Sequence, residues 1–201
     1  DELLAETWDT QATRLQEQFQ HDFWLPEEHT FALALDAHAH PCRVVSSNAG
    51  HCLYGHIASS AQARQLIERF FQEDMFCGWG IRTLSAQSRR YNPMSYHNGS
   101  VWPHDNALIA AGFARYGATD QAERILSALF DASACVADRR LPELFCGFPR
   151  QAHQGPVPYP VACKPQAWAA GSLFQFLQAI LGLRIDAWAH RMTLGRVVLP
   201  G

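Results

Sequence analysis

Residues 103–116 read PHDNALIAAGFARY, and this stretch decides the fold. Proline at its first position and Gly117 just past its end are typical boundaries of an α-helix. Apolar side chains occur on every side of this helix, so it has no polar face to turn toward water. Residues 165–181, PQAWAAGSLFQFLQAIL, begin with proline and end before Gly182, and they show the same pattern. We predict that both helices are enclosed on all sides.

Two further segments carry an apolar stripe on one side only. They are SSAQARQLIERFFQE at 59–73 and ATDQAERILSALFDA at 118–132. Their apolar residues follow the i, i+3, i+4, i+7, i+8 spacing of an amphipathic helix, with Ser59 or Ser60 and Thr119 as suitable N-caps. The apolar positions of the two segments differ by a constant offset, which indicates an internal repeat. We expect each helix to expose one face.

Enclosed helices therefore alternate along the chain with one-sided helices, and residues 1–23 form another amphipathic helix. An inner ring of helices wrapped by an outer ring produces this alternation, so we predict an all-α double-ring fold. Residues 30–36 alternate like a short strand, and 42–46 are expected to pair with them as a β-hairpin on the rim.

Composition restricts the function. Apolar residues make up 48% of the chain and charged residues 17%, with a net charge of −3 and no cluster of Lys or Arg. This balance disfavours nucleic acid and anionic membranes as partners, and no apolar run is long enough to span a bilayer. The acidic first residues are unlike a signal peptide, so we expect a cytoplasmic protein.

The six cysteines include no C-x-x-C pair, and we expect free thiols. A zinc site using Cys52 with His56, or His38 with His40, is the rival interpretation, but this spacing is weak. We therefore expect neither a metal nor a cofactor.

Long aromatic, glycine-containing loops at 74–102 and 138–164 are candidates for function, because long unstructured loops in compact domains are usually functional. Aromatic faces stack on sugar rings, and planar polar groups bond to hydroxyls. The alternative is that the aromatics only plug the ring, that His97 is structural and that Asp105 caps its helix. The candidate sugar-binding residues around the first loop are Trp79, Arg82, Tyr96, His97, Asn98, Trp102 and Asp105.

Glu143 stands in the segment LPELFCGF at 141–148, with no charged residue within two positions. A carboxylate among apolar residues is unfavourable unless it is catalytic or paired. The alternative is a structural ion pair with Arg150 or Arg82. Glycoside hydrolysis needs two carboxylates, and we interpret Glu143 as one of them. The remaining loop-end candidates for the other are Asp36, Asp74 and Asp105.

The sequence resembles a known group of proteins along nearly its whole length. It resembles the bacterial glycogen-debranching-enzyme-like (amylo-alpha-1,6-glucosidase-like) glycoside hydrolases, which are related to mannosylglycerate hydrolases, glucoamylases and trehalases with an (α/α)6 barrel. The most specific segments are RYNPMSYHNGSVWPHDNALIAAGFARYG at 90–117 and LPELFCGFPR at 141–150. Weaker ones are SSNAGHCLYGHIA at 46–58, GWGIRTLS at 78–85 and YPVACKPQAWAAGS at 159–172.

This resemblance implies an inverting hydrolase of α-glycosidic bonds in oligo- or polysaccharides. The family's general acid, an aspartate, comes from the first half of the barrel, and its general base, a glutamate, comes from the second. Glu143 matches the base, and Trp168 joins the expected substrate-binding residues. The family's Trp-Lys-Asp-Ser-like acid motif is absent from this sequence. We therefore expect residues 1–201 to be the C-terminal portion of a single catalytic domain, partnered by the N-terminal remainder of the barrel.

Two other functions remain open at this point. The chain is a non-catalytic carbohydrate-binding remnant, or it belongs to another helical-toroid enzyme such as a sugar epimerase. The epimerase reading requires His97 and either His51 or His153 to transfer protons at one substrate position.

Overall fold

The computed structural model describes residues 2–195, and this part of the chain contains six helices and four short strands. The helices are α1 (Glu2–Phe23), α2 (Asn48–Tyr54), α3 (Ser60–Phe70), α4 (Pro103–Arg115), α5 (Thr119–Ala134) and α6 (Ala167–Leu181). The strands are β1 (Trp24–Leu25), β2 (Thr30–Phe31), β3 (Arg184–Asp186) and β4 (Arg191–Thr193).

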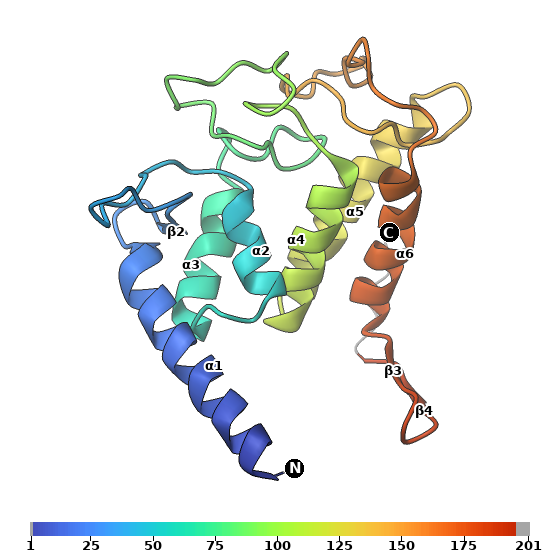
Figure 1. Ribbon diagram of the computed structural model, residues 1–201. Coiled ribbons are helices and arrows are strands. Elements are labelled where there is room, and N and C mark those ends of the chain that lie inside the picture. The colour runs from blue at the N-terminus through green and yellow to red at the C-terminus, as the bar shows by residue number, and fades with distance from the viewer. Residues whose placement is uncertain (1, 196–201) are drawn as a thin grey trace.

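Helices α2, α4 and α6 begin at the same end of the molecule, and the loops at 74–102 and 138–164 gather at that end (Figure 1). Helices α3 and α5 run in the opposite direction and lead into these loops. The β3–β4 hairpin and the start of α1 lie at the other end (Figure 1). Helix α4 is central, because it packs against α2, α5 and α6. The arrangement places both predicted functional loops over the N-termini of α4 and α6.

The prediction that residues 103–116 form an enclosed helix is confirmed. Pro103 is the first residue of α4, Trp102 is its N-cap, and Gly117 follows the helix with a positive φ of 79°. Most of the α4 side chains are buried, and they include Asp105 and Asn106 as well as apolar residues. Asn106 is satisfied inside the core, since its side chain bonds to the backbone of Ile81 and Trp102.

The one-sided pattern of α3 and α5 is also confirmed. The buried residues of α3 are Ala63, Leu66, Ile67 and Phe70, and those of α5 include Ala122, Ile125, Leu126 and Leu129. Ser59 caps α3 in a reciprocal capping box with Gln62. The expected Thr119 cap is wrong, because Ala118 takes the N-cap position of α5 and Thr119 is already helical.

The prediction that residues 165–181 are enclosed on all sides is wrong for the described residues. One side of α6 packs on α4 and α5 through residues such as Phe176 and Ile180. The other side carries Trp168, Leu173, Phe174 and Leu177, and these side chains are 40–75% exposed. Nothing between residues 2 and 195 covers this apolar face.

Helix α1 packs on the described core only near its end, where Phe19 and Phe23 are partly buried. Phe19 stacks on Phe23 with ring centroids 4.6 Å apart and also contacts Phe31. The earlier apolar positions Leu4 and Trp8 are exposed. The first half of α1 therefore extends away from the described core (Figure 1).

The expected hairpin between 30–36 and 42–46 forms only in part. Strand β2 pairs instead with β1, which places Phe31 opposite Trp24. Leu35 and Pro41 form an isolated bridge, and Cys42 exchanges backbone hydrogen bonds with Leu33 and Ala34. Proline at position 41 has no N–H to donate, so this pairing does not extend into a regular ladder. The β3–β4 hairpin was not predicted.

None of the helices within residues 2–195 combines the length and apolarity that crossing a membrane requires. The six cysteines all lie in this range and are unpaired, with Cys77 and Cys146 buried.

The close packing of α2 on α4 leads to a test of stability. A Cβ added at Gly112 would lie 2.7 Å from the backbone nitrogen of Tyr54 and 2.9 Å from the Cβ of Leu53. We expect Gly112→Ala to lower the free energy of unfolding by about 1–3 kcal/mol, because one of the two helices must shift. Gly171→Ala is the matched control, since nothing lies within 4 Å of its added Cβ. It should be neutral or stabilising by up to ~1 kcal/mol. Urea unfolding measures both, and equal effects would contradict this account of the packing.

Candidate active site

Two backbone hydrogen bonds bring the two long loops together. Val101 N–H donates to the Phe145 carbonyl over 2.9 Å, and Phe145 N–H donates to the Val101 carbonyl over 3.1 Å. The backbone of Val101 also forms a β-bridge with Arg82, and the backbone of Phe145 also forms a β-bridge with Pro158. Because the bridge between Val101 and Phe145 is antiparallel, the segment before Val101 lies beside the segment after Phe145.

A second contact between the loops depends on glycine. Gly147 lies against Gly99, and a Cβ at position 147 would collide with the Gly99 carbonyl oxygen. Gly99 itself has a φ of 144°, which disfavours any residue with a side chain. Only glycine at both positions allows the two backbones to approach this closely.

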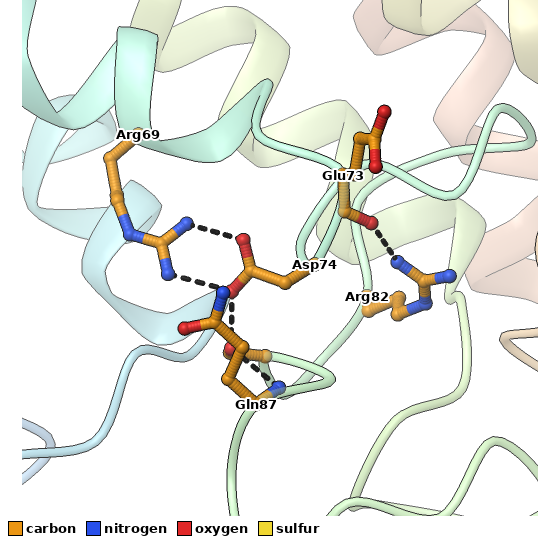
Figure 2. Close-up of polar contacts among 6 residues, drawn as sticks. Arg69, Glu73, Asp74, Arg82 and Gln87 are labelled. Carbon is orange, nitrogen blue, oxygen red and sulfur yellow. Dashed lines mark hydrogen bonds and ion pairs between the residues drawn. The ribbon is translucent and has the colours of Figure 1, made fainter.

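The first loop is anchored at its base by a buried ion pair (Figure 2). Arg69 donates to both carboxylate oxygens of Asp74 over 2.8 and 2.6 Å, and the Ser85 hydroxyl donates to the same carboxylate. Burial by itself raises the pKa of Asp74, but the hydrogen bonds from Arg69 and Ser85 and the Arg69 charge outweigh it and hold that pKa below its usual value. Asp74 is therefore committed to the loop anchor, and this removes it as a candidate acid.

Arg82 acts as a second anchor. Its side chain is 2% exposed, and its Nε donates to the Gly147 carbonyl over 2.7 Å. Its Nη1 donates to the Glu73 carbonyl over 2.8 Å (Figure 2). These contacts tie the start of the first loop to the second loop. The structure does not bring the Arg82 side chain to a shared opening with Glu143.

Trp79 is likewise a core residue. Its side chain is 3% exposed, and the Arg150 guanidinium covers its ring at 4.3 Å from the centroid. Arg150 is paired on its other side with Asp131 over 2.7 Å. Trp79 therefore fills space beneath the loop, which fits the plugging alternative for this residue.

Glu143 is held on both of its carboxylate oxygens. The Tyr96 hydroxyl donates to Oε1 over 2.7 Å, and the Cys163 backbone N–H donates to Oε2 over 3.1 Å. Glu143 N–H in turn donates to the Cys163 carbonyl over 3.0 Å. These bonds from Tyr96 and Cys163 lower the pKa of Glu143, so the carboxylate is ionised at neutral pH. The alternative interpretation of Glu143, an ion pair with Arg82 or Arg150, is wrong, because no such pair forms among the described residues.

A row of rings continues from Glu143 across the N-termini of α4 and α6. Each ring meets the next at a steep angle, with centroids 4.6–5.6 Å apart. The row, which we call the aromatic row, consists of Tyr159, Tyr96, Trp102, His104 and Trp168. His97 lies beside it, parallel to the Trp102 ring at 6.0 Å. Trp168 is 62% exposed, so the row ends at an open aromatic face.

The first turn of α4 adds polar groups to this row. Asp105 Oδ1 lies 2.7 Å from His51 Nε2, and this hydrogen bond raises the pKa of His51. The second oxygen of Asp105 and Nδ1 of His104 are buried and have no hydrogen-bond partner among the described residues. Burial also lowers the pKa of His104, which favours its neutral form. Two buried polar atoms in the first turn of α4 thus have no hydrogen-bond partner within residues 2–195.

The structure thus places Tyr96 in contact with Glu143, while Trp102 and Trp168 lie further along the aromatic row. His97 lies beside Trp102, and Asp105 lies in the first turn of α4. Asn98 lies on the same turn as Tyr96 with its side chain exposed. Asp36 lies elsewhere, where it accepts hydrogen bonds from the backbone of His38 and His40 in an exposed turn.

Three members of the site were not predicted from the sequence. His104 stands between Trp102 and Asp105, so its neighbours were a usable signal. Tyr159 and the Cys163 backbone come from a distant part of the second loop, and no spacing points to them. Within residues 2–195, no three or more His, Cys, Asp or Glu side chains are arranged to hold a metal ion.

The family model for the mannosylglycerate hydrolase MGH1-like glycoside hydrolase domain matches residues 1–148. The chain belongs to this glycoside hydrolase family. The match includes Glu143, the Tyr96–Asp105 segment and both loop anchors of this MGH1-like chain. No curated protein matches the sequence at a significant level.

Solved structures of low sequence identity share the fold of this MGH1-like chain. The GH63 mannosylglycerate hydrolase from Thermus thermophilus aligns with a TM-score of 0.60 and 22% identity, over 78% of this chain and 35% of that one. The neutral trehalase Nth1 from Saccharomyces cerevisiae aligns with a TM-score of 0.63 and 19% identity, over 86% of this chain and 30% of that one. A sialidase aligns with a TM-score of 0.69 and 14% identity, over 92% of this chain and 18% of that one. The chain thus has the six-hairpin (α/α)6 glycosidase fold in part and spans about a third of the first of these relatives.

The loop anchor makes a testable contribution to stability. Asp74→Asn leaves Arg69, whose side chain is only 15% exposed, without a counter-charge, so the free energy of unfolding at pH 7 should fall by about 3 kcal/mol. Because the pKa of Asp74 is lowered by folding, its contribution is present above the ordinary value of 3.8 and is lost as the pH falls below it. The difference between wild type and variant should therefore shrink in acid.

Asp131→Asn is the matched control for this test. Its ion pair with Arg150 is about half exposed, so its loss should cost less than ~1 kcal/mol. Urea unfolding between about pH 3 and pH 7 measures both variants. An Asp74→Asn variant as stable as Asp131→Asn would contradict the anchor.

Proposed function

We propose that this chain supplies the general-base part of an inverting glycoside hydrolase that cleaves α-glycosidic bonds. The observation that carries the proposal is the ionised Glu143 carboxylate, fixed between Tyr96 and Cys163 beside the aromatic row. A structural carboxylate is usually paired with a cation, whereas both oxygens of Glu143 meet only neutral donors. Such a group is ready to accept a proton.

The proposed chemistry follows from this geometry. Each oxygen of Glu143 uses one acceptor position for its neutral donor, which leaves a position free to bind water. Glu143 removes a proton from that water as it attacks the anomeric carbon, and a second carboxylic acid protonates the leaving oxygen. In inverting enzymes the two carboxyl groups lie roughly 6.5–9.5 Å apart. We assign the acid to the remainder of the barrel, as the sequence resemblance implies.

The Trp168 end of the aromatic row is the proposed sugar platform. Trp168 offers an open aromatic face for a sugar ring, and His97 and Asn98 lie exposed near Trp102, which is itself buried. His104 contacts the Trp168 ring from the first turn of α4, and Asp105 on the same turn holds His51. This division assigns chemistry to Glu143 and sugar recognition to Trp168, His97 and Asn98.

The proposed substrate class is an α-glucosidic oligo- or polysaccharide, as in debranching enzymes. The resemblance of the 90–117 and 141–150 segments supports this choice. The matching family is named for mannosylglycerate hydrolase, so mannosylglycerate is the principal competing substrate. A panel of both kinds of glycoside decides between them.

We assign the exposed apolar faces of α1 and α6 to contacts with the rest of the barrel. Leu4, Trp8 and Leu15 are exposed on α1, and Trp168, Leu173, Phe174 and Leu177 are exposed on α6. The two helices lie at opposite sides of the described part of the chain (Figure 1). A partial ring has two open edges, and helical hairpins closing it would cover both faces. The partner is therefore the N-terminal remainder of the same barrel.

The catalytic assignment is tested by Glu143→Gln in a polypeptide that supplies the rest of the barrel. Glutamine keeps the shape of the side chain but accepts no proton from water, so kcat should fall at least about a hundredfold. KM should change much less, because the aromatic row supplies the binding. Glu73→Gln is the matched control, since the Glu73 side chain is exposed and only its backbone contacts Arg82.

Steady-state kinetics with NMR detection of the product anomer measure these effects, and the first-formed anomer should be inverted. The 201-residue chain without the remaining barrel should be inactive. Near-wild-type kcat in Glu143→Gln would overturn the assignment. No turnover by any complete barrel, with sugar binding retained, would favour a non-catalytic binding protein.

Barrel closure is tested by Phe174→Lys. Phe174 is 75% exposed in this chain, so a charge there should leave the isolated 201-residue chain almost as stable as wild type. In the complete barrel the same residue should be buried, and the variant should be destabilised by several kcal/mol. Phe130→Lys is the control, because Phe130 is 65% exposed on the outer helix α5 and should tolerate the charge in both contexts. Thermal unfolding of all four proteins measures this, and equal tolerance at both positions in the complete barrel would contradict it.

A further inference from the structure

Tyr96 is fixed in place through its backbone as well as its ring. Its carbonyl oxygen accepts hydrogen bonds from the Ser100 hydroxyl over 2.7 Å and from the Trp102 indole N–H over 3.1 Å. Its ring meets the Trp102 and Tyr159 rings edge-on, with centroids 4.7 and 5.6 Å apart. These contacts leave the side chain little rotational freedom, so its hydroxyl occupies a defined position.

At that position the Tyr96 hydroxyl forms a hydrogen bond with Glu143. The hydroxyl donates to Oε1, while the Cys163 N–H donates to Oε2, so the carboxylate is gripped from two directions. A hydrogen bond from a neutral donor stabilises the ionised carboxylate over the protonated acid. The same bond raises the pKa of Tyr96 to about 12, so the phenol stays protonated while Glu143 exchanges protons. Tyr96 therefore remains a donor throughout the neutral pH range.

We propose that Tyr96 is a positioning residue for Glu143, which holds the carboxylate oriented for water activation, and that it does not act by binding sugar. This inference rests on the proposed function of Glu143 and revises the role expected of Tyr96 from the sequence. The hydroxyl is already committed to the carboxylate, and its ring edges are covered by Trp102 and Tyr159. The water proton passes to Glu143, and no proton leaves Tyr96 in this step.

Tyr91 supplies a matched comparison within the same loop. Its hydroxyl donates to the Gly147 carbonyl over 3.1 Å, so it supports the loop without touching Glu143. Tyr91→Phe and Tyr96→Phe each remove one oxygen atom and one hydrogen bond of the same loop. A general loosening of the loop would affect both variants, whereas the proposed role is specific to Tyr96.

The direct test requires no enzymatic activity. Carbon-13 NMR of the 201-residue chain, labelled at glutamate carboxyls and assigned with Glu143→Gln, follows the titration of Glu143. Tyr96→Phe should move the Glu143 midpoint to higher pH, because the ionised form loses a donor, while Tyr91→Phe should leave it unchanged. An unchanged midpoint in Tyr96→Phe, or an equal shift in Tyr91→Phe, overturns the inference.

The kinetic test uses the complete barrel. Tyr96→Phe should lower kcat by about ten- to a hundredfold through misorientation of the base, with little change in KM. The acid limb of the kcat/KM profile should move to higher pH in parallel with the NMR midpoint, because the base must be ionised to act. A raised KM with unchanged kcat would indicate uniform sugar binding and would overturn the positioning role.

The two tests separate the failure of this inference from failure of the proposed function. If Glu143→Gln retains turnover, Glu143 is not the base, but the NMR comparison still decides whether Tyr96 controls its ionisation. If Glu143→Gln is inactive and Tyr96→Phe leaves the NMR midpoint in place, the base assignment stands and the role of Tyr96 falls.

Discussion

The reciprocal backbone hydrogen bonds between Val101 and Phe145 are the constraint on which the site depends. They join two loops that leave from different outer helices, and they fix the register in which Tyr96 reaches Glu143. The contact between Gly99 and Gly147 permits this closeness, and Arg82 secures it from below by binding the Gly147 carbonyl. The position of the Glu143 carboxylate therefore depends on the backbone pairing of the two loops more than on the residues next to Glu143 in the sequence.

The site also draws on the direction of the inner helices. Helices α4 and α6 both begin beneath the loops, so their unpaired N–H groups and positive dipole ends face the same region (Figure 1). Asp105 lies in the first turn of α4, where its carboxylate is favoured by the dipole and by His51. The capping role expected as an alternative is not confirmed, because neither oxygen of Asp105 accepts a hydrogen bond from the backbone within residues 2–195. One oxygen of Asp105 meets His51, and the other has no partner within residues 2–195.

The exposed apolar faces of α1 and α6 fit a sequence with few charged residues. A helix with apolar residues all round is stable in water only if each side meets another apolar surface. Helix α4 meets this condition, because α2, α5 and α6 surround it. Helix α6 meets it on one side only, and the large side chains Trp168 and Phe174 remain open. The same sequence pattern has two outcomes because α6 lies at an edge of the described ring segment.

The sequence by itself determined α3, α4, α5 and most of α6, and it separated the enclosed α4 from the one-sided α3 and α5. These properties depend on local signals, such as the proline and glycine at the ends of α4 and the stripes of α3 and α5. It also singled out Glu143, because a lone carboxylate among apolar residues is unusual at any position. The sequence did not predict α2, the start of α6 at Ala167 or the open side of α6. Only the tertiary structure decided which aromatic and basic residues of the first loop lie near Glu143. Trp79 and Arg82 satisfied the same composition rule as Tyr96 and His97, but their side chains turn into the core. The partners of Glu143 come from segments 47 residues before it and 20 residues after it. No local pattern encodes such contacts, because they arise only when the loops pair across the helix ends.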